Sequence, residues 1–313
     1  MIHKFEVKVS QFYWLPILGS ILGVTTIILC YFITILNGYF EPILPFISHT
    51  AIFSPSSLIF GLGITFTTIA IALSILLWKF DSDNFIESAF EKKEDSYQIR
   101  HSSNPSKTYQ KVKFLNKVAL AFASLAIITF LILAQANVSL LKYWSKCNFT
   151  YLIWFQTSSK DYRLLHNLSA FTAFFSVLVF FSTIQITKWN LFYHHFHPKL
   201  FCASLTLLIA GWLSFLIFAL LQFMIYLKSD SNPNADGIVF YETLMTRFFQ
   251  DGPLRVPFVI ASFSEWLAAA CVFALCFLLK FDIRDSDVIL VAHSYESHKL
   301  CRIGCNDDGE PVR

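Results

Sequence analysis

The stretch from Asn37 to Gly61, NGYFEPILPFISHTAIFSPSSLIFG, joins two apolar segments that are each long enough to cross a membrane. Its three prolines, Pro42, Pro45 and Pro55, fix the backbone angle φ and remove backbone donors, so no helix can run through the stretch. The stretch contains no Lys or Arg, which is typical of a short connection on the non-cytoplasmic side of a membrane. Because it also holds many apolar residues, we expect this first loop to fold down onto the membrane-spanning part of the protein.

The composition is that of a membrane protein. Hydrophobic residues make up 55% of the chain and charged residues 14%, whereas soluble chains carry about 25% charged residues. The apolar residues form runs of roughly 18 or more, which are typical of membrane-spanning helices rather than core helices of soluble domains. The net charge of +3 is small, and the basic residues form no stripe, so we expect the lipid bilayer as a partner and no nucleic acid.

Six such runs predict an all-α fold, a polytopic bundle of six transmembrane helices. The expected spans are residues 14–36, 57–78, 115–136, 164–187, 200–227 and 256–279. Residues 1–290 would form one six-span membrane domain, and residues 291–313 a flexible cytoplasmic tail. The hydrophilic segment 79–113 is expected to be a mobile loop with one short helix around residues 84–94. Gly19 and Gly23 form a G-x-x-x-G pattern that allows close helix contact, either inside this bundle or between two copies.

The distribution of basic residues predicts the orientation of the bundle. The connections on the side of the two termini hold 15 Lys and Arg, and those on the opposite side hold seven, which predicts cytoplasmic termini. Two Asn-x-Ser/Thr sequences then lie on the lumenal side, at Asn137 and Asn148. Asn148 is the better candidate for glycosylation, because Asn137 directly follows a span.

One acidic residue, Glu265, lies well inside an expected span. It follows Val256 by nine residues, which corresponds to a depth of about 14 Å at 1.5 Å per residue. An ionised carboxylate there would be strongly disfavoured, so the group must be neutral, paired or in contact with water. A structural role, as a protonated carboxyl bonded to a neighbouring helix, and a functional role, as a proton or ligand site, are both open. His166, Gln135 and Gln222 are the candidate partners.

Catalytic, cofactor and phosphate-binding motifs are absent from the sequence, so we expect no catalytic, cofactor-binding or metal site. The cluster of His194, His195 and His197 is interpreted as an interfacial turn rather than a metal site. Cys301 and Cys305 lie in the polar tail with His293 and His298, and these cysteines are interpreted as inert or acylated rather than as part of a zinc site.

The first loop also carries a family resemblance. Its run PILPFISHTAIFSPSSLIFG resembles the first-loop signature of the damage-regulated autophagy modulator (DRAM) family, which reads roughly P-x-L-P-[YF]-I-S-D-T-G followed by P-E and F-G. The matching residues include Pro42, Pro45, Phe46, Ser48, Thr50, Pro55 and Gly61. His49 and Ser56 stand where the family usually has Asp and often Glu. His166 with Ser169 and Ala170, and Ser264 with Glu265 and Trp266, resemble two further family patterns in the fourth and sixth spans.

This resemblance extends over about residues 10 to 290 and implies a function. It implies a non-catalytic, multi-pass membrane protein that regulates autophagy or lysosomal function, located in the lysosome or another endomembrane. The two sequons add the expectation that this protein is glycosylated. The plasma membrane and the Golgi are alternative locations. The wider superfamily includes proteins of glycosylphosphatidylinositol-lipid remodelling and phosphoinositide regulation, so a lipid-handling protein or enzyme accessory is an alternative. A proton-coupled transporter that uses Glu265 is a second alternative.

Overall fold

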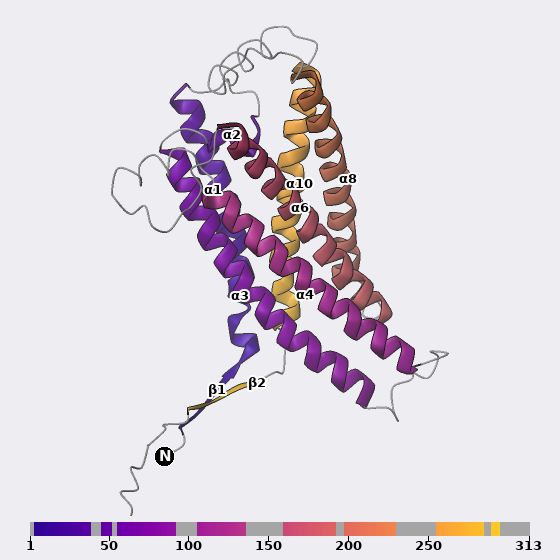
Figure 1. Cartoon of the computed structure of the whole chain (residues 1–313). Coiled ribbons are helices and arrows are strands. Elements are labelled where there is room, and N and C mark those ends of the chain that lie inside the picture. Colours follow the sequence, from indigo (N-terminus) through magenta and orange to yellow (C-terminus); the bar gives the residue numbers. More distant parts are fainter. Residues whose placement is uncertain are drawn as a thin grey trace, which may run out of the picture.

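A computed structural model describes residues 3–38, 45–51, 55–91, 105–135, 159–191, 197–229, 255–284 and 289–294. Six long helices dominate it, and all six are long and apolar enough to cross a membrane. They are α1 (Trp14–Leu36), α3 (Ser56–Glu91), α4 (Pro105–Gln135), α6 (Ser159–Asn190), α8 (Pro198–Ser229) and α10 (Arg255–Arg284). The predicted six-span helical bundle is therefore confirmed, and the chain is an integral membrane protein (Figure 1).

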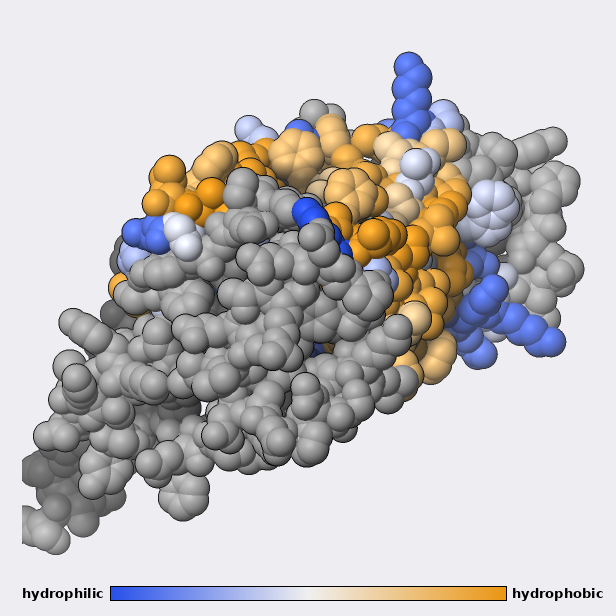
Figure 2. Space-filling model, turned by 90° about the horizontal axis from the view of Figure 1, so that it is seen from above, coloured by the Kyte–Doolittle hydropathy of each residue, from blue (hydrophilic) through white to orange (hydrophobic). Residues whose placement is uncertain are grey.

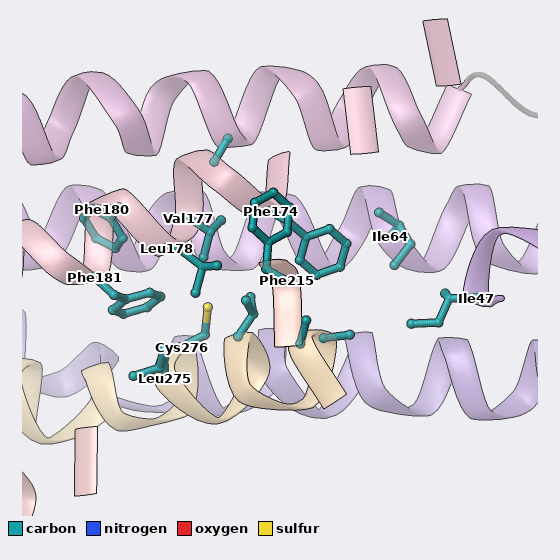
Figure 3. Packing of buried hydrophobic residues seen from close by; sticks show 14 of the residues in the cluster. Ile47, Ile64, Phe174, Val177, Leu178, Phe180, Phe181, Phe215, Leu275 and Cys276 are labelled. Atoms are coloured by element: carbon teal, nitrogen blue, oxygen red, sulfur yellow. The ribbon is translucent and has the colours of Figure 1, made fainter. Parts of the chain in front are cut away.

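The bundle is a closed ring in which each long helix contacts the next one along the chain. The last helix, α10, returns to contact α1, and it also touches α3 and α6. Helix α6 contributes the buried Phe174, Phe180 and Phe181 to the core, and Phe181 lies beside Leu275 of α10 (Figure 3). Apolar side chains are also exposed on the flank of the bundle (Figure 2), as expected for a surface that faces lipid.

Glycines allow the close contact between helices that the sequence suggested. A Cβ atom on Gly23 would lie 2.2 Å from the Phe273 ring of α10, and one on Gly19 would lie 2.7 Å from Ile71 of α3. The G-x-x-x-G pattern of α1 therefore packs against neighbours within the same bundle. Gly63 of α3 makes the reciprocal close contact, with Thr26 of α1.

Helices α3 and α4 are longer than the sequence suggested. The hydrophilic segment from residue 79 was expected to be a loop with a short helix around residues 84–94, but α3 continues without a break to Glu91. The helix continues because residues 79–91 contain no Pro or Gly, and polarity alone does not end a helix. Two bonds support the extension: Lys79 pairs with Asp83 one turn later, and Asn116 of α4 donates to Asp83 Oδ1 over 2.7 Å.

Two short strands, which the sequence analysis did not predict, join the ends of the chain. Strand β1 (His3–Lys8) pairs with β2 (Ile289–Ser294) in antiparallel register, from His3 opposite Ser294 to Lys8 opposite Ile289. A short 3-10 helix, η1 (Val9–Phe12), then leads into α1. The first residues of the expected polar tail therefore belong to a strand, and residues 295–313 lie outside the described residues.

Candidate functional site at the docked first loop

The described part of the first loop, residues 45–51, is packed into one end of the bundle. We call this the first-loop end and the opposite end, which carries β1 and β2, the terminal end (Figure 1). Helix α2 (Ile47–Thr50) makes a single turn, and Thr50 Oγ1 donates to the Ile47 carbonyl over 2.7 Å. Phe46, Ile47 and Ala51 are buried, so the expected folding of the loop onto the bundle is observed here. Pro42 lies outside the described residues.

Two consecutive side chains of α10 hold the start of α2. The Ile47 backbone N–H donates to Glu265 Oε2 over 2.7 Å, and the Trp266 indole N–H donates to the Pro45 carbonyl over 2.8 Å. The N–H groups of a first helical turn have no partner inside the helix, so the carboxyl supplies an acceptor that α2 lacks. Together the two bonds clamp the backbone on both sides of Phe46.

The other end of the loop is held by α1. Thr34 Oγ1 donates to the Thr50 carbonyl over 2.8 Å and lies 3.1 Å from the Ser56 hydroxyl at the start of α3. The Cys30 thiol contacts the Ser56 carbonyl at 3.4 Å. Thr34, Thr50 and Ser56 are fully buried. A loop that enters the bundle must have its polar backbone groups satisfied, and the Thr34 and Cys30 side chains meet part of that requirement.

Aromatic packing fixes the side of α2 that faces the bundle. The Phe46 ring lies 4.6 Å from Phe258 of α10 and 6.0 Å from Phe218 of α8, in edge-on arrangements. His49 packs against Phe46 at 5.0 Å and is only 9% exposed. Burial, and secondarily the charge of the nearby His166, lower the pKa of His49 to about 3. His49 is therefore neutral at any physiological pH.

A small cavity lies beside the clamp, between α2, α6, α8 and α10. Its polar lining consists of Ser48, His166, Asn167, Gln222 and Glu265, and its aromatic lining of Phe46, Phe171 and Phe218. The cavity volume is about 20 Å³, which is room for one water molecule or one group of similar size.

The structure thus brings Glu265 together with His166 and Gln222, two of its three candidate partners. The third, Gln135, is the last residue of α4, and its side chain lies outside the described residues. The bond that Glu265 makes is not to a neighbouring span, as the structural interpretation supposed, but to the backbone of the first loop. Glu265 lies ten residues after Arg255, the first residue of α10, so α2 must enter the bundle to reach it.

Sequence reasoning did not identify Thr34, Ser56 and Cys30 as loop-holding residues. The available signal was their position, because all three lie close to the ends of the two spans that the loop connects. Other candidates stay untested by the structure: Asn137, Asn148, His194 and His195 lie outside the described residues, and the described residues contain no cluster of metal-ligating side chains.

Comparison with known proteins gives one match. The family model described as the Frag1/DRAM/Sfk1/Cwh43P N-terminal domain matches residues 11–286. Searches of curated proteins and of solved structures give no match. The matched range begins at the end of η1 and ends just after α10, so it contains the whole ring of helices and both sides of the clamp.

Proposed function

Because the chain belongs to the Frag1/DRAM/Sfk1/Cwh43P family of membrane proteins, we propose that it is a non-catalytic regulator of autophagy or lysosomal function. Its place would be the lysosomal membrane or another endomembrane. The family is not generally known for catalysis, which supports a regulatory role. The first loop supports the DRAM branch in particular, because Pro45, Phe46 and Thr50 match the first-loop signature of that branch.

The contact between the first loop and α10 is the observation that carries this proposal. Pro45 and Phe46 belong to the first-loop signature, and Glu265 and Trp266 to the pattern in the sixth span. These two signatures lie more than 200 residues apart, yet they meet in two hydrogen bonds. A regulator requires an element with two alternative arrangements whose balance other molecules can shift. We propose that the docked loop, which is held by a few contacts, is such an element.

The same contact argues for the regulatory role over proton transport. In a transporter, the intramembrane carboxyl must exchange protons or ligands with both sides of the membrane. Here one oxygen of Glu265 is engaged by the Ile47 backbone, and the residue is 6% exposed. This arrangement favours use of the carboxyl to hold the loop.

The test is complementation in cells that lack the protein. Wild type, Trp266→Phe and the double variant Pro45→Ala/Phe46→Ala would be expressed at matched levels, with Trp189→Phe at the terminal end as a matched control. Co-localisation with lysosomal, Golgi and plasma-membrane markers would be recorded beside lysosomal turnover of an autophagy reporter. We expect wild type and the control to localise to endomembranes and restore turnover, and the loop variants to fail. Normal turnover without the protein, or full rescue by both loop variants, would contradict the proposal.

A further inference from the structure

The cavity beside the clamp has an unusual chemical lining for its size. Gln222 Oε1, which lines it, is a buried acceptor that has no hydrogen-bond partner within the described part of the chain. Glu265 also lines the cavity, and its Oε2 accepts from the Ile47 N–H. Leaving a buried acceptor unsatisfied costs about 1–3 kcal/mol. The Gln222 oxygen therefore predicts that a donor occupies the cavity beside Glu265.

The aromatic lining narrows the choice of donor. Phe171 and Phe218 stack at 5.3 Å between centroids, and Phe46 meets Phe218 edge-on at 6.0 Å. All three rings line the cavity, and among the described residues no Lys or Arg does so. Aromatic faces attract cations, the more strongly when water is excluded. A carboxyl, a carbonyl acceptor and three phenyl rings together form a site with the chemistry of cation recognition.

The volume of the cavity restricts the choice of donor further. About 20 Å³ accommodates a group the size of one water molecule. A primary ammonium group is that size and has three N–H donors, whereas a trimethylammonium group is several times larger and has none. We propose that this cavity binds a primary ammonium group, carried by an ethanolamine-type lipid headgroup or by a free amine. Glu265, Gln222 and Phe171 recognise it.

Binding would also resolve the charge state of Glu265. An isolated carboxylate at this depth is disfavoured, but one that is paired with a cation is tolerated. When the ammonium enters, the carboxyl proton leaves to water, and the ammonium becomes the positive partner of the carboxylate. The Ile47 N–H still donates to Oε2, so the loop stays docked. The amine site is independent of the proposed role in autophagy, because the lining of the cavity alone defines it.

Thermal unfolding of the purified full chain provides the test. The chain would be reconstituted in phosphatidylcholine nanodiscs with and without phosphatidylethanolamine, and unfolding followed by tryptophan fluorescence. Soluble ethanolamine would be titrated in parallel, with choline as the size control. A ligand that binds only the folded state raises the melting temperature. We expect a rise with phosphatidylethanolamine or with ethanolamine, and none with choline. A response to the lipid alone identifies a lipid headgroup, and a response to ethanolamine identifies the amine itself.

Three variants make the test specific. Glu265→Gln keeps an acceptor for Ile47 but cannot pair with a cation, so the response should disappear while the protein stays folded. Gln222→Leu should weaken binding by about tenfold or more, since hydrogen bonds to charged groups contribute about 1.5–3 kcal/mol. Phe175→Leu, one turn from Phe171 and outside the cavity lining, is the matched control and should respond as wild type. An equal response to choline, no response to either amine source, or a response unchanged in both cavity variants would overturn the proposal.

Discussion

The two ends of the bundle are held together by different kinds of contact. At the first-loop end the bonds run between side chains and backbone: Glu265 with Ile47, Trp266 with Pro45, and Thr34 with Thr50. At the terminal end the pairs Lys188–Asp282 and Lys79–Asp83 join charged side chains, beside one side-chain-to-backbone bond from Gln185 to the Phe201 carbonyl. The difference follows from what enters the membrane. A loop that folds into the bundle brings unpaired backbone groups with it, whereas helices that extend into water bring only their side chains.

The largest expected effect concerns the orientation of the two ends. If the first-loop end faces the lumen, the sequon at Asn148 carries a glycan, and glycosidase treatment shifts the mass of the protein. Asn148→Gln should remove that shift entirely, whereas Asn137→Gln should leave it. Protease protection of the segment between α3 and α4, instead of the segment between α4 and α6, would reverse the assignment of the ends.

Removing the acceptor at the first-loop end should destabilise the protein by about 2 kcal/mol. In Glu265→Leu the buried Ile47 N–H loses its partner, and a buried unsatisfied donor costs about 1–3 kcal/mol. Glu265→Gln keeps an acceptor of nearly the same shape and should unfold near wild type. Melting temperatures of both variants in detergent provide the measurement. Equal melting of the Leu and Gln variants would show that the bond to Ile47 contributes nothing.

Acidification should loosen the first-loop end specifically. The unfolded chain protonates His49 below about pH 6.5, but the folded protein does so only near pH 3, because His49 is buried and His166 is close. Stability is therefore lost as the pH falls below 6.5, by about 2 kcal/mol at pH 5. His49→Asn removes this group's contribution while other titrating groups, such as His166 and Glu265, remain. The difference between the two melting curves across pH 5 to 7.5 isolates the effect, and parallel curves would refute it.

At the terminal end, loss of the Lys188–Asp282 pair should cost about 1–2 kcal/mol. The side chains are 20% and 10% exposed, between a surface pair, which contributes about 0–1 kcal/mol, and a buried one. Lys188→Met leaves Asp282 without its cation, and the double variant Lys188→Met/Asp282→Asn should recover part of the loss. High salt should reduce the difference between wild type and double variant. If Lys188→Met lost as much stability as Glu265→Leu, and the loss did not depend on salt, the two ends would not differ in the way described.

The smallest effect should come from the Lys79–Asp83 pair. Lys and Asp one helical turn apart, with Asp83 49% exposed, contribute about 0.3–0.5 kcal/mol. Lys79→Met should therefore lower the melting temperature only slightly, because Asn116 still donates to Asp83. Asp83→Ala removes both bonds and serves as the comparison. A large loss in Lys79→Met would mean that the α3 extension depends on this one pair.

The sequence predicts the spans well and their continuations poorly. Apolar runs of about 20 residues indicate where a helix lies in the membrane, and the expected first span, residues 14–36, has the bounds of α1. The end of α3 could not be predicted in this way, because the helix continues into water and stops at Glu91 rather than at the membrane boundary. The pairing of β1 with β2 depends on contacts between the two ends of the chain, which no local pattern reveals.

Residues of the candidate site could be predicted from the sequence, but the hydrogen bonds that join them could not. Glu265 is conspicuous because a carboxyl inside an apolar span needs a partner, and Phe46 because it lies in a loop too apolar for water. That Glu265 bonds the backbone next to Phe46 required the fold, since a backbone N–H looks the same at every position of the sequence.

The pairing of β1 with β2 brings the first and the last described elements of the chain together. Helix α1 also lies against α10, so the first and last elements are neighbours in space. A cut elsewhere in the ring, for example between α3 and α4, would leave two pieces that still share the strand pair and the α1–α10 contact. We expect such pieces, made separately, to reassemble, and a linker from β2 to β1 should allow new ends to be opened between α3 and α4.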